Sequence, residues 1–196
     1  RYDPIFIDKK HSVEWHISEF EKMAEILAGY TKTCVISFID IYKKVERNFP
    51  EAKSVRAEDR AMIGKAFVKI ASKYGMVLKP CAEGEELAKY GADCSGCMTV
   101  HTFETALHSR LEVPKRKKNQ RNGECACLLG TDIGAYDTCG HLCKYCYANV
   151  NPVLVKENMR KHNPESPFLI GGYMSGDIVR DAIQKSWIDR QIRLEF

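Results

Sequence analysis

Thr33-Cys-Val-Ile-Ser-Phe-Ile39 is the stretch of sequence that decides the fold. It is almost continuously apolar and rich in β-branched and aromatic side chains, which is typical of a parallel strand covered on both faces. Parallel strands are joined by crossover connections that usually contain a helix, so the neighbouring segments should alternate between strand and helix. The sequence therefore predicts an α/β fold with 33–39 inside a parallel sheet.

The segments before and after this strand fit the expected alternation. The sequence predicts strands at 2–7 and 76–79, and helices at about 12–30, 56–74 and 85–90. Ser12 can cap the first of these helices, and Gly75 can end the second. The first 90 residues thus predict three strand-helix units of a parallel sheet.

The composition changes at Gly91, after which the chain is dense in cysteine, glycine and charge. Further on, we expect a helix at about 101–109, a strand at 167–170 and a last helix capped by Asp177. We divide the chain into 1–90, a βαβαβα portion of a barrel-like domain; 91–149, a Cys-rich metal-cluster region; and 150–196, a C-terminal strand/helix segment of the same domain.

The small number of predicted strands has a consequence for the edges of the sheet. A complete (β/α) barrel has eight strands, whereas three or four leave apolar edges uncovered. The sequence also begins with Arg1 rather than Met. We therefore expect a partial barrel, a fragment completed by a missing N-terminal half or by a partner chain.

The overall composition narrows the classes of function. The 196 residues carry a net charge of +4, which is too small to favour nucleic acid as the main partner, and the apolar runs are too short to cross a membrane. The nine cysteines are an odd number in a chain with no export signal. We therefore expect a soluble, cytoplasmic protein whose cysteines are reduced thiols and metal ligands.

Cys139-Gly-His-Leu-Cys143-Lys-Tyr-Cys146 places three thiols within eight residues of one loop. Thiolates are soft ligands that suit iron-sulfur clusters and zinc. A [4Fe-4S] cluster has four irons, so three protein ligands would leave one iron open to a small molecule. This spacing favours an iron-sulfur cluster.

The Cys-x3-Cys-x2-Cys loop, with an aromatic residue before its last cysteine, resembles the signature of the radical S-adenosylmethionine (SAM) superfamily. The resemblance implies SAM at the open iron, an electron donor and an unidentified substrate. It also implies the following contacts: the cluster on Cys139, Cys143 and Cys146, the adenine of SAM on Tyr145, and its amino group at Gly171 and Gly172.

A second resemblance covers nearly the whole chain and is to a bacterial family of domains of unknown function, number 1848, whose cysteine cluster is radical-SAM-like. It rests on these segments: Arg1-Tyr-Asp-Pro4, Ile36-Ser-Phe-Ile-Asp40, Cys81-Ala-Glu83, Gln120-Arg121, Cys125-Ala-Cys127 and Asp132-Ile-Gly-Ala-Tyr-Asp-Thr-Cys139. The resemblance implies further strand-helix units before Arg1.

Two alternatives to SAM chemistry follow from the same cysteines. One is a zinc site completed by His141 or another thiol, in a nucleic-acid-binding module whose basic run 115–121 would contact phosphates. The other is a fully ligated cluster that only transfers electrons or senses redox state.

Two further groups of residues are candidates for a site. Cys94, Cys97, Cys125 and Cys127 form two pairs that could hold a second metal. At strand ends, where parallel sheets bind their ligands, the candidates are Asp3, Asp8, Asp40, Cys81 and Glu83. Asp residues in these places also cap helices and turns. Cys34, inside a strand, is expected to be a small buried hydrophobe.

Overall fold

The computed structural model describes residues 1–114, 127–128, 134–183 and 185–191. Its elements, in chain order, are β1 (Tyr2–Ile5), α1 (Val13–Leu27), β2 (Thr33–Phe38), α2 (Lys43–Asn48), α3 (Ala57–Lys73), β3 (Val77–Pro80), the 3-10 helix η1 (Ala88–Tyr90), α4 (Val100–Leu107) and α5 (Pro152–Lys161).

The chain forms two compact units, which are described separately. Unit 1 comprises Arg1–Ile41, Ala52–Leu129 and Ser186–Phe196, and unit 2 comprises Tyr42–Glu51 and Gly130–Lys185. The Cys-rich region is divided between them at Leu129. None of the helices described here combines the length and the apolarity needed to cross a membrane.

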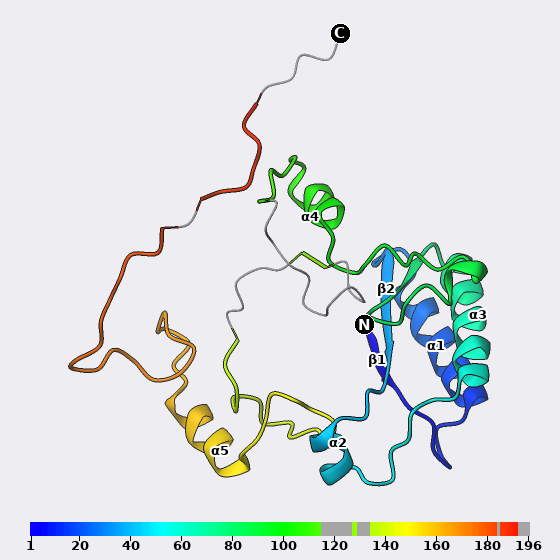
Figure 1. The fold of residues 1–196 in the computed structure, drawn as a ribbon, viewed down its shortest axis with the longest axis horizontal. Helices are drawn as coiled ribbons and strands as arrows, with labels where there is room; N and C mark the ends of the chain where they lie inside the picture. Colours follow the sequence, from blue (N-terminus) through cyan, green and yellow to red (C-terminus); the bar gives the residue numbers. More distant parts are fainter. Residues whose placement is uncertain (115–126, 129–133, 184, 192–196) are drawn as a thin grey trace. The chain divides into compact units, whose positions relative to one another are not determined.

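Unit 1 contains a parallel sheet with the strand order β1-β2-β3. β2 is the central strand, and Ile36 pairs with Tyr2 on one side and with Pro80 on the other. Figure 1 shows α1 and α3 side by side against one face of the sheet. The predicted α/β fold with a parallel sheet is confirmed. Within the described residues the sheet stays open, with three strands and no closure into a barrel.

The core of unit 1 lies between the sheet and the two helices. Ile36 of β2 and Phe67 of α3 have no exposed surface, and Phe20 of α1 is 3% exposed. The rings of Phe20 and Phe67 stack with their centroids 3.9 Å apart, and Tyr2 of β1 meets both rings edge-on. Burial of these apolar side chains is the main force that holds the sheet and helices together.

The boundaries that the sequence predicted from Ser12 and Gly75 are confirmed for α1 and α3. The Ser12 hydroxyl accepts a hydrogen bond from the Trp15 backbone N–H at the start of α1. Gly75 follows α3 with a φ of +72°, a left-handed conformation that favours glycine. The helix expected at about 85–90 is shorter, because only Ala88–Tyr90 form a 3-10 turn before Gly91.

Two elements expected near the C-terminus are wrong. Residues 167–170 form bends instead of a strand, and no helix follows Asp177 in the described part of the segment. A strand needs a hydrogen-bonding neighbour, and a short helix needs a surface on which to bury its apolar side chains. Ile183, an apolar residue of the segment after Asp177, is 95% exposed, so its side chain is not buried on any such surface.

Two helices occur where the sequence reading expected none. The first is α2, which lies between the strand predicted at 33–39 and the helix predicted at about 56–74. The second is α5, which begins with a recognisable signal: the Asn151 side chain accepts hydrogen bonds from the Val153 and Leu154 N–H groups, and Pro152 is the first helical residue. Both helices belong to unit 2.

His16 is a buried polar side chain in the core of unit 1, with 3% of its surface exposed. Its Nε2 lies 2.7 Å from the Phe6 carbonyl oxygen, and its Nδ1 lies 2.7 Å from the Tyr2 hydroxyl. The neutral ring satisfies both contacts when Nε2–H donates to Phe6 and Nδ1 accepts from Tyr2. Burial lowers the pKa of His16 because it disfavours the charged imidazolium.

The lowered pKa of His16 predicts a loss of stability in acid. The unfolded chain takes up a proton at this histidine near pH 6.5, whereas the folded chain does so only at lower pH, so the contribution is complete above about pH 6.5 and is lost as the pH falls below it. Urea unfolding at pH 7.5 and 5.5 should show a smaller pH dependence in His16→Gln than in the wild type. The control His101→Gln, at an exposed position, should keep the wild-type dependence. Equal pH dependence in all three proteins would contradict the assignment.

Candidate functional site

The loop from Cys139 to Cys146 belongs to unit 2 and precedes α5. All three of its cysteines are free thiols; Cys139 and Cys143 are exposed and Cys146 is partly exposed. A hydrogen bond from the Cys146 N–H to the Cys143 carbonyl, 3.0 Å long, closes a turn, and Leu142 before it has a φ of +51°. The thiols therefore lie in a loop at the surface of their unit, and Cys143 and Cys146 flank its last turn.

Asp137 joins the two ends of this loop. Its N–H donates to the Ala148 carbonyl at 2.9 Å, and its carboxylate accepts from the N–H groups of Asn151 and Val150 at 2.8 and 2.5 Å. These bonds lower the pKa of Asp137, since they favour the carboxylate form. The Asp137 carbonyl also accepts from the side-chain amide of Asn158 in α5. Both ends of the cysteine loop are thus tied to the start of α5.

Two buried polar atoms near the loop have no hydrogen-bond partner among the described residues. One is the Oδ1 atom of Asn149, a residue that is 7% exposed and donates through Nδ2 to the Cys139 carbonyl at 2.6 Å. The other is the ammonium nitrogen of Lys44 in α2, whose charge helps to lower the pKa of Asp137. A buried polar atom without a partner is unfavourable by about 1–3 kcal/mol. Both atoms therefore favour the binding of a further polar group.

The segment that contains α2 contacts the cysteine loop directly. The Tyr42 hydroxyl donates to the Tyr145 carbonyl, and the Lys144 ammonium lies 5.2 Å from the centroid of the Phe49 ring. Sequence reasoning named Tyr145 but missed Tyr42, Lys44, Phe49 and Asn149 as its surroundings. The one available signal was local: Val45 and Phe49 are four residues apart, as on one face of a helix, and both are buried.

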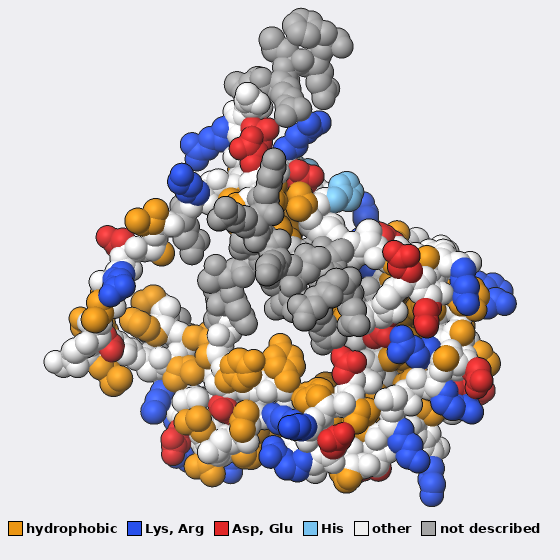
Figure 2. Space-filling view, in the orientation of Figure 1, with side chains coloured by type: hydrophobic (Ala, Val, Ile, Leu, Met, Phe, Trp, Pro, Cys, Tyr) orange, Lys and Arg blue, Asp and Glu red, His pale blue; other side chains and the backbone are white. Residues whose placement is uncertain are grey.

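Apolar side chains with large exposed surfaces surround the loop in sequence. Tyr136, Tyr147, Val150 and Val153 are each more than 60% exposed, and Figure 2 shows hydrophobic side chains gathered on the face of unit 2 around α5. Exposed apolar surface of this kind marks sites of binding to other molecules.

The loop thiols do not form a site for a single metal ion. Across residues 1–114, 127–128, 134–183 and 185–191, no group of three or more His, Cys, Asp or Glu side chains is arranged to hold one. His141, considered as a zinc ligand, is among the residues covered by this finding.

Comparison with known protein families identifies the chain. The model of the family described as "Domain of unknown function (DUF1848)" matches residues 1–148. The chain belongs to the DUF1848 family. The match confirms the family expected from the sequence segments, and it includes the cysteine loop but ends before α5. Neither the curated proteins nor the solved structures contain a match.

The residues expected to contact SAM lie in unit 2. The Tyr145 side chain is 37% exposed. Gly171 has a φ of +65°, and its N–H donates to the carbonyl of Lys161 at the end of α5. A Cβ atom added at Gly171 or Gly172 would meet no other atom within 4 Å. The positive φ therefore accounts for a glycine at position 171. Close contact with neighbouring atoms does not account for a glycine at either position.

Of the strand-end acids, Glu83 has an evident structural role. Its buried carboxylate accepts from the Phe38 N–H at 2.7 Å and pairs with the Arg60 guanidinium at 2.8 Å. Burial raises the pKa of Glu83, and these two contacts oppose that effect. Glu83 therefore ties the loop after β3 to the end of β2.

The remaining acids are less buried than Glu83. Asp3 pairs with the Arg1 guanidinium at 2.6 Å, and Asp40 is exposed. Asp8 accepts from the N–H groups of Lys10 and His11, which is the turn-forming role considered for it. The structure does not bring these acids together with Glu83 as a metal-binding group.

The cysteines predicted to hold a second metal have different neighbours in unit 1 from those that the sequence pairs suggested. Cys97 lies 3.2 Å from Cys127 and 3.7 Å from Cys81, measured between sulfur atoms. Cys94 faces the Ala92 carbonyl instead, and burial raises its pKa. Cys81 was predicted as a strand-end candidate, not as a neighbour of these thiols.

Three predictions remain, for Cys34, for Cys125 and for the basic run 115–121. Cys34 packs against the apolar core, as predicted, and burial raises its pKa. Cys125 and the basic run 115–121 lie outside the described residues.

Proposed function

We propose that this protein binds a [4Fe-4S] cluster through Cys139, Cys143 and Cys146, and that SAM binds to the fourth iron. One observation carries the proposal: three free, solvent-accessible thiols lie within one loop of eight residues whose ends are tied together by Asp137. Free cysteine is otherwise among the most buried residue types, so packing does not explain three accessible thiols in eight residues. Ligation of a soft metal centre explains why three accessible thiols lie so close together.

The unpartnered atoms beside the loop fit such a group. An iron-sulfur cluster held by three thiolates is negatively charged overall, and a buried ammonium such as that of Lys44 would offset this charge. Asn149 contributes an acceptor oxygen without a partner next to the Cys139 carbonyl, where the ammonium group of an amino-acid moiety could donate.

The surrounding residues have roles that follow from their positions. Asp137 would hold the ends of the cysteine loop in place, and α2 would hold its last turn through Tyr42 and Tyr145. The exposed apolar side chains near the loop would contact a substrate and exclude water from it. When bound, the cluster would supply the electron that breaks a carbon-sulfur bond of SAM. An external electron donor would then be required.

We further propose that the sheet of unit 1 is part of a larger (β/α) barrel. The strands follow each other in sequence order, and α1 and α3 cover one face only. A barrel has this arrangement, whereas a doubly wound sheet reverses its order and carries helices on both faces. The remaining strands would come from a longer chain or from a partner.

The proposal predicts the metal content and the spectrum of the purified protein. After anaerobic reconstitution with iron and sulfide, we expect about four irons and four sulfides per chain, and a reduced-state electron paramagnetic resonance spectrum that changes when SAM is added. Zinc without iron or sulfide would contradict the proposal. A cluster whose electron paramagnetic resonance spectrum does not change when SAM is added would indicate a fully ligated redox centre instead.

A further inference from the structure

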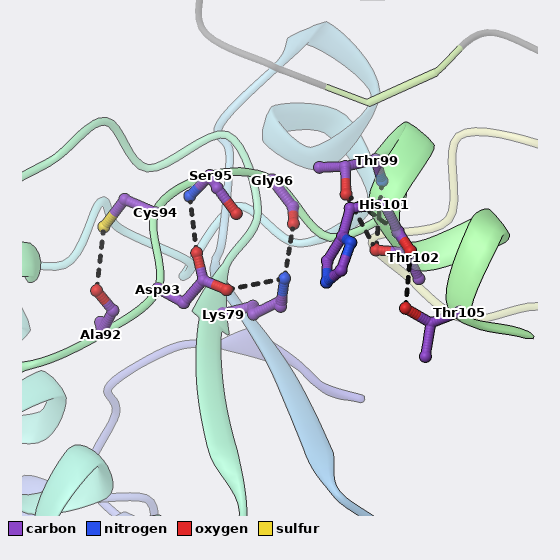
Figure 3. A network of polar contacts seen from close by, with 10 residues as sticks. All are labelled: Lys79, Ala92, Asp93, Cys94, Ser95, Gly96, Thr99, His101, Thr102 and Thr105. Carbon is purple, nitrogen blue, oxygen red and sulfur yellow. Dashed lines mark hydrogen bonds and ion pairs between the residues drawn. The ribbon is translucent and has the colours of Figure 1, made fainter. Parts of the chain in front are cut away.

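The loop after η1 is held against β3 by a lysine and by a backbone hydrogen bond from the Asp93 N–H to the Leu78 carbonyl, 2.9 Å long. Lys79 pairs with the Asp93 carboxylate at 2.8 Å and donates to the Gly96 carbonyl at 3.2 Å (Figure 3). Cys81 directly follows β3, and its sulfur atom lies 3.7 Å from that of Cys97. Lys79 therefore brings the loop, and with it Cys97, to the side of the sheet edge where Cys81 lies.

A backbone hydrogen bond brings a third thiol to this place. The Leu128 N–H donates to the Met98 carbonyl at 2.7 Å, which sets Cys127 beside Cys97. The two sulfur atoms are 3.2 Å apart. Cys97 is 8% exposed, and Cys127 is more accessible. The two thiols are thus close, held by their neighbours and unequal in access to solvent.

We propose that Cys97 and Cys127 are a redox-active dithiol that reduces a low-molecular-weight disulfide and closes into an intramolecular disulfide. A disulfide bond is about 2.05 Å long, so the sulfur atoms need to approach by about 1.2 Å. This movement would come from rotation of the two side chains, with the hydrogen bond between Leu128 and Met98 kept. The dithiol lies in unit 1, whereas the loop thiols lie in unit 2, and it does not depend on the proposed cluster.

The reaction proceeds in two exchange steps. The thiolate of Cys127 attacks one sulfur of the small disulfide, forms a mixed disulfide and releases one thiol, which keeps the proton lost by Cys127. Cys97 then gives up its proton and attacks the sulfur of Cys127, which releases the second thiol. The two protein thiols are oxidised by two electrons in total, and the small disulfide is reduced to two thiols.

The difference in burial sets the order of these steps. Cys97 is the more buried of the two thiols, and burial raises its pKa because it disfavours the charged thiolate. The more accessible Cys127 is therefore the first nucleophile. Cys97 acts second, when the mixed disulfide is held next to it.

The experiment treats the reduced protein with oxidised glutathione, blocks the remaining thiols with a maleimide and maps the peptides by mass spectrometry. We expect a cross-linked peptide that joins Cys97 to Cys127. Cys97→Ser should remove this peptide and leave glutathione on Cys127. In Cys127→Ser, glutathione should reach Cys97 at least roughly tenfold more slowly than it reaches Cys127 in Cys97→Ser. Cys94→Ser is the matched control from the same loop and should keep the wild-type amount of cross-link.

Three outcomes would overturn the proposal. The first is a stable glutathione adduct on wild-type Cys127 without a cross-link. The second is a cross-link between Cys81 and Cys97 in its place. The third is protection of Cys97 and Cys127 from both reagents by co-purified zinc, which would mark a metal site. Because these peptides are separate from those of the loop thiols, the result is distinguishable from a failure of the cluster proposal.

Discussion

Replacement of Cys139, Cys143 and Cys146 by serine should abolish iron and sulfide binding while the protein stays folded. Hydroxyl groups are poor ligands for a soft centre, so the reconstituted variant should retain less than roughly a tenth of the wild-type iron. The three thiols are at least partly exposed and lie outside the apolar core of unit 1, so urea unfolding should change by no more than about 0.5 kcal/mol.

The control for this experiment is Cys94→Ser, which removes a thiol that faces the Ala92 carbonyl in unit 1. It should bind as much iron as the wild type. Iron retained by the triple variant, or lost equally from Cys94→Ser, would show that the loop does not ligate the cluster. Single replacements at the three loop positions should each have a large effect, because each removes one of three ligands.

Phe67→Ala should lower the free energy of unfolding of unit 1 by about 3–5 kcal/mol. The Phe67 ring has no exposed surface, stacks on Phe20 and meets Tyr2, so its removal leaves a cavity between α1, α3 and β1. Small domains are stable by only about 5–15 kcal/mol in total, so the variant should be marginal at room temperature.

The matched control for Phe67→Ala is Met62→Ala on the same helix. Met62 is 51% exposed, and its replacement should change the free energy of unfolding by less than about 0.5 kcal/mol. Urea unfolding monitored by circular dichroism measures both. A loss below about 1 kcal/mol for Phe67→Ala would contradict the packing described for the core.

The elements of unit 1 were predictable because their signals are local. The apolar run at 33–39 marks β2, the Ser12 side chain caps α1, and Gly75 ends α3. Each signal acts within about one turn of helix or one strand, where backbone conformation and hydrogen bonding depend on neighbours in sequence. The cysteine loop was recognisable for the same reason, since its three thiols share eight residues.

The strand expected at 167–170 shows where local signals fail. Its side chains favour a strand, yet a strand exists only when another segment supplies hydrogen bonds to its edge. No described segment does so for these residues. In contrast, α2 is short and has a modest local signal, but Val45 and Phe49 are buried in the finished structure.

The amino-acid sequence by itself determined the parallel α/β core, the start of α1 and the end of α3, the family and the compact set of loop thiols. Only the tertiary structure decided that Tyr42 meets Tyr145, 103 residues away, and that Cys97 meets Cys81 and Cys127 across 16 and 30 residues. Such contacts depend on where whole elements pack, which is set by the combined burial and hydrogen bonding of many residues. No short stretch of sequence contains enough information to predict that combined effect.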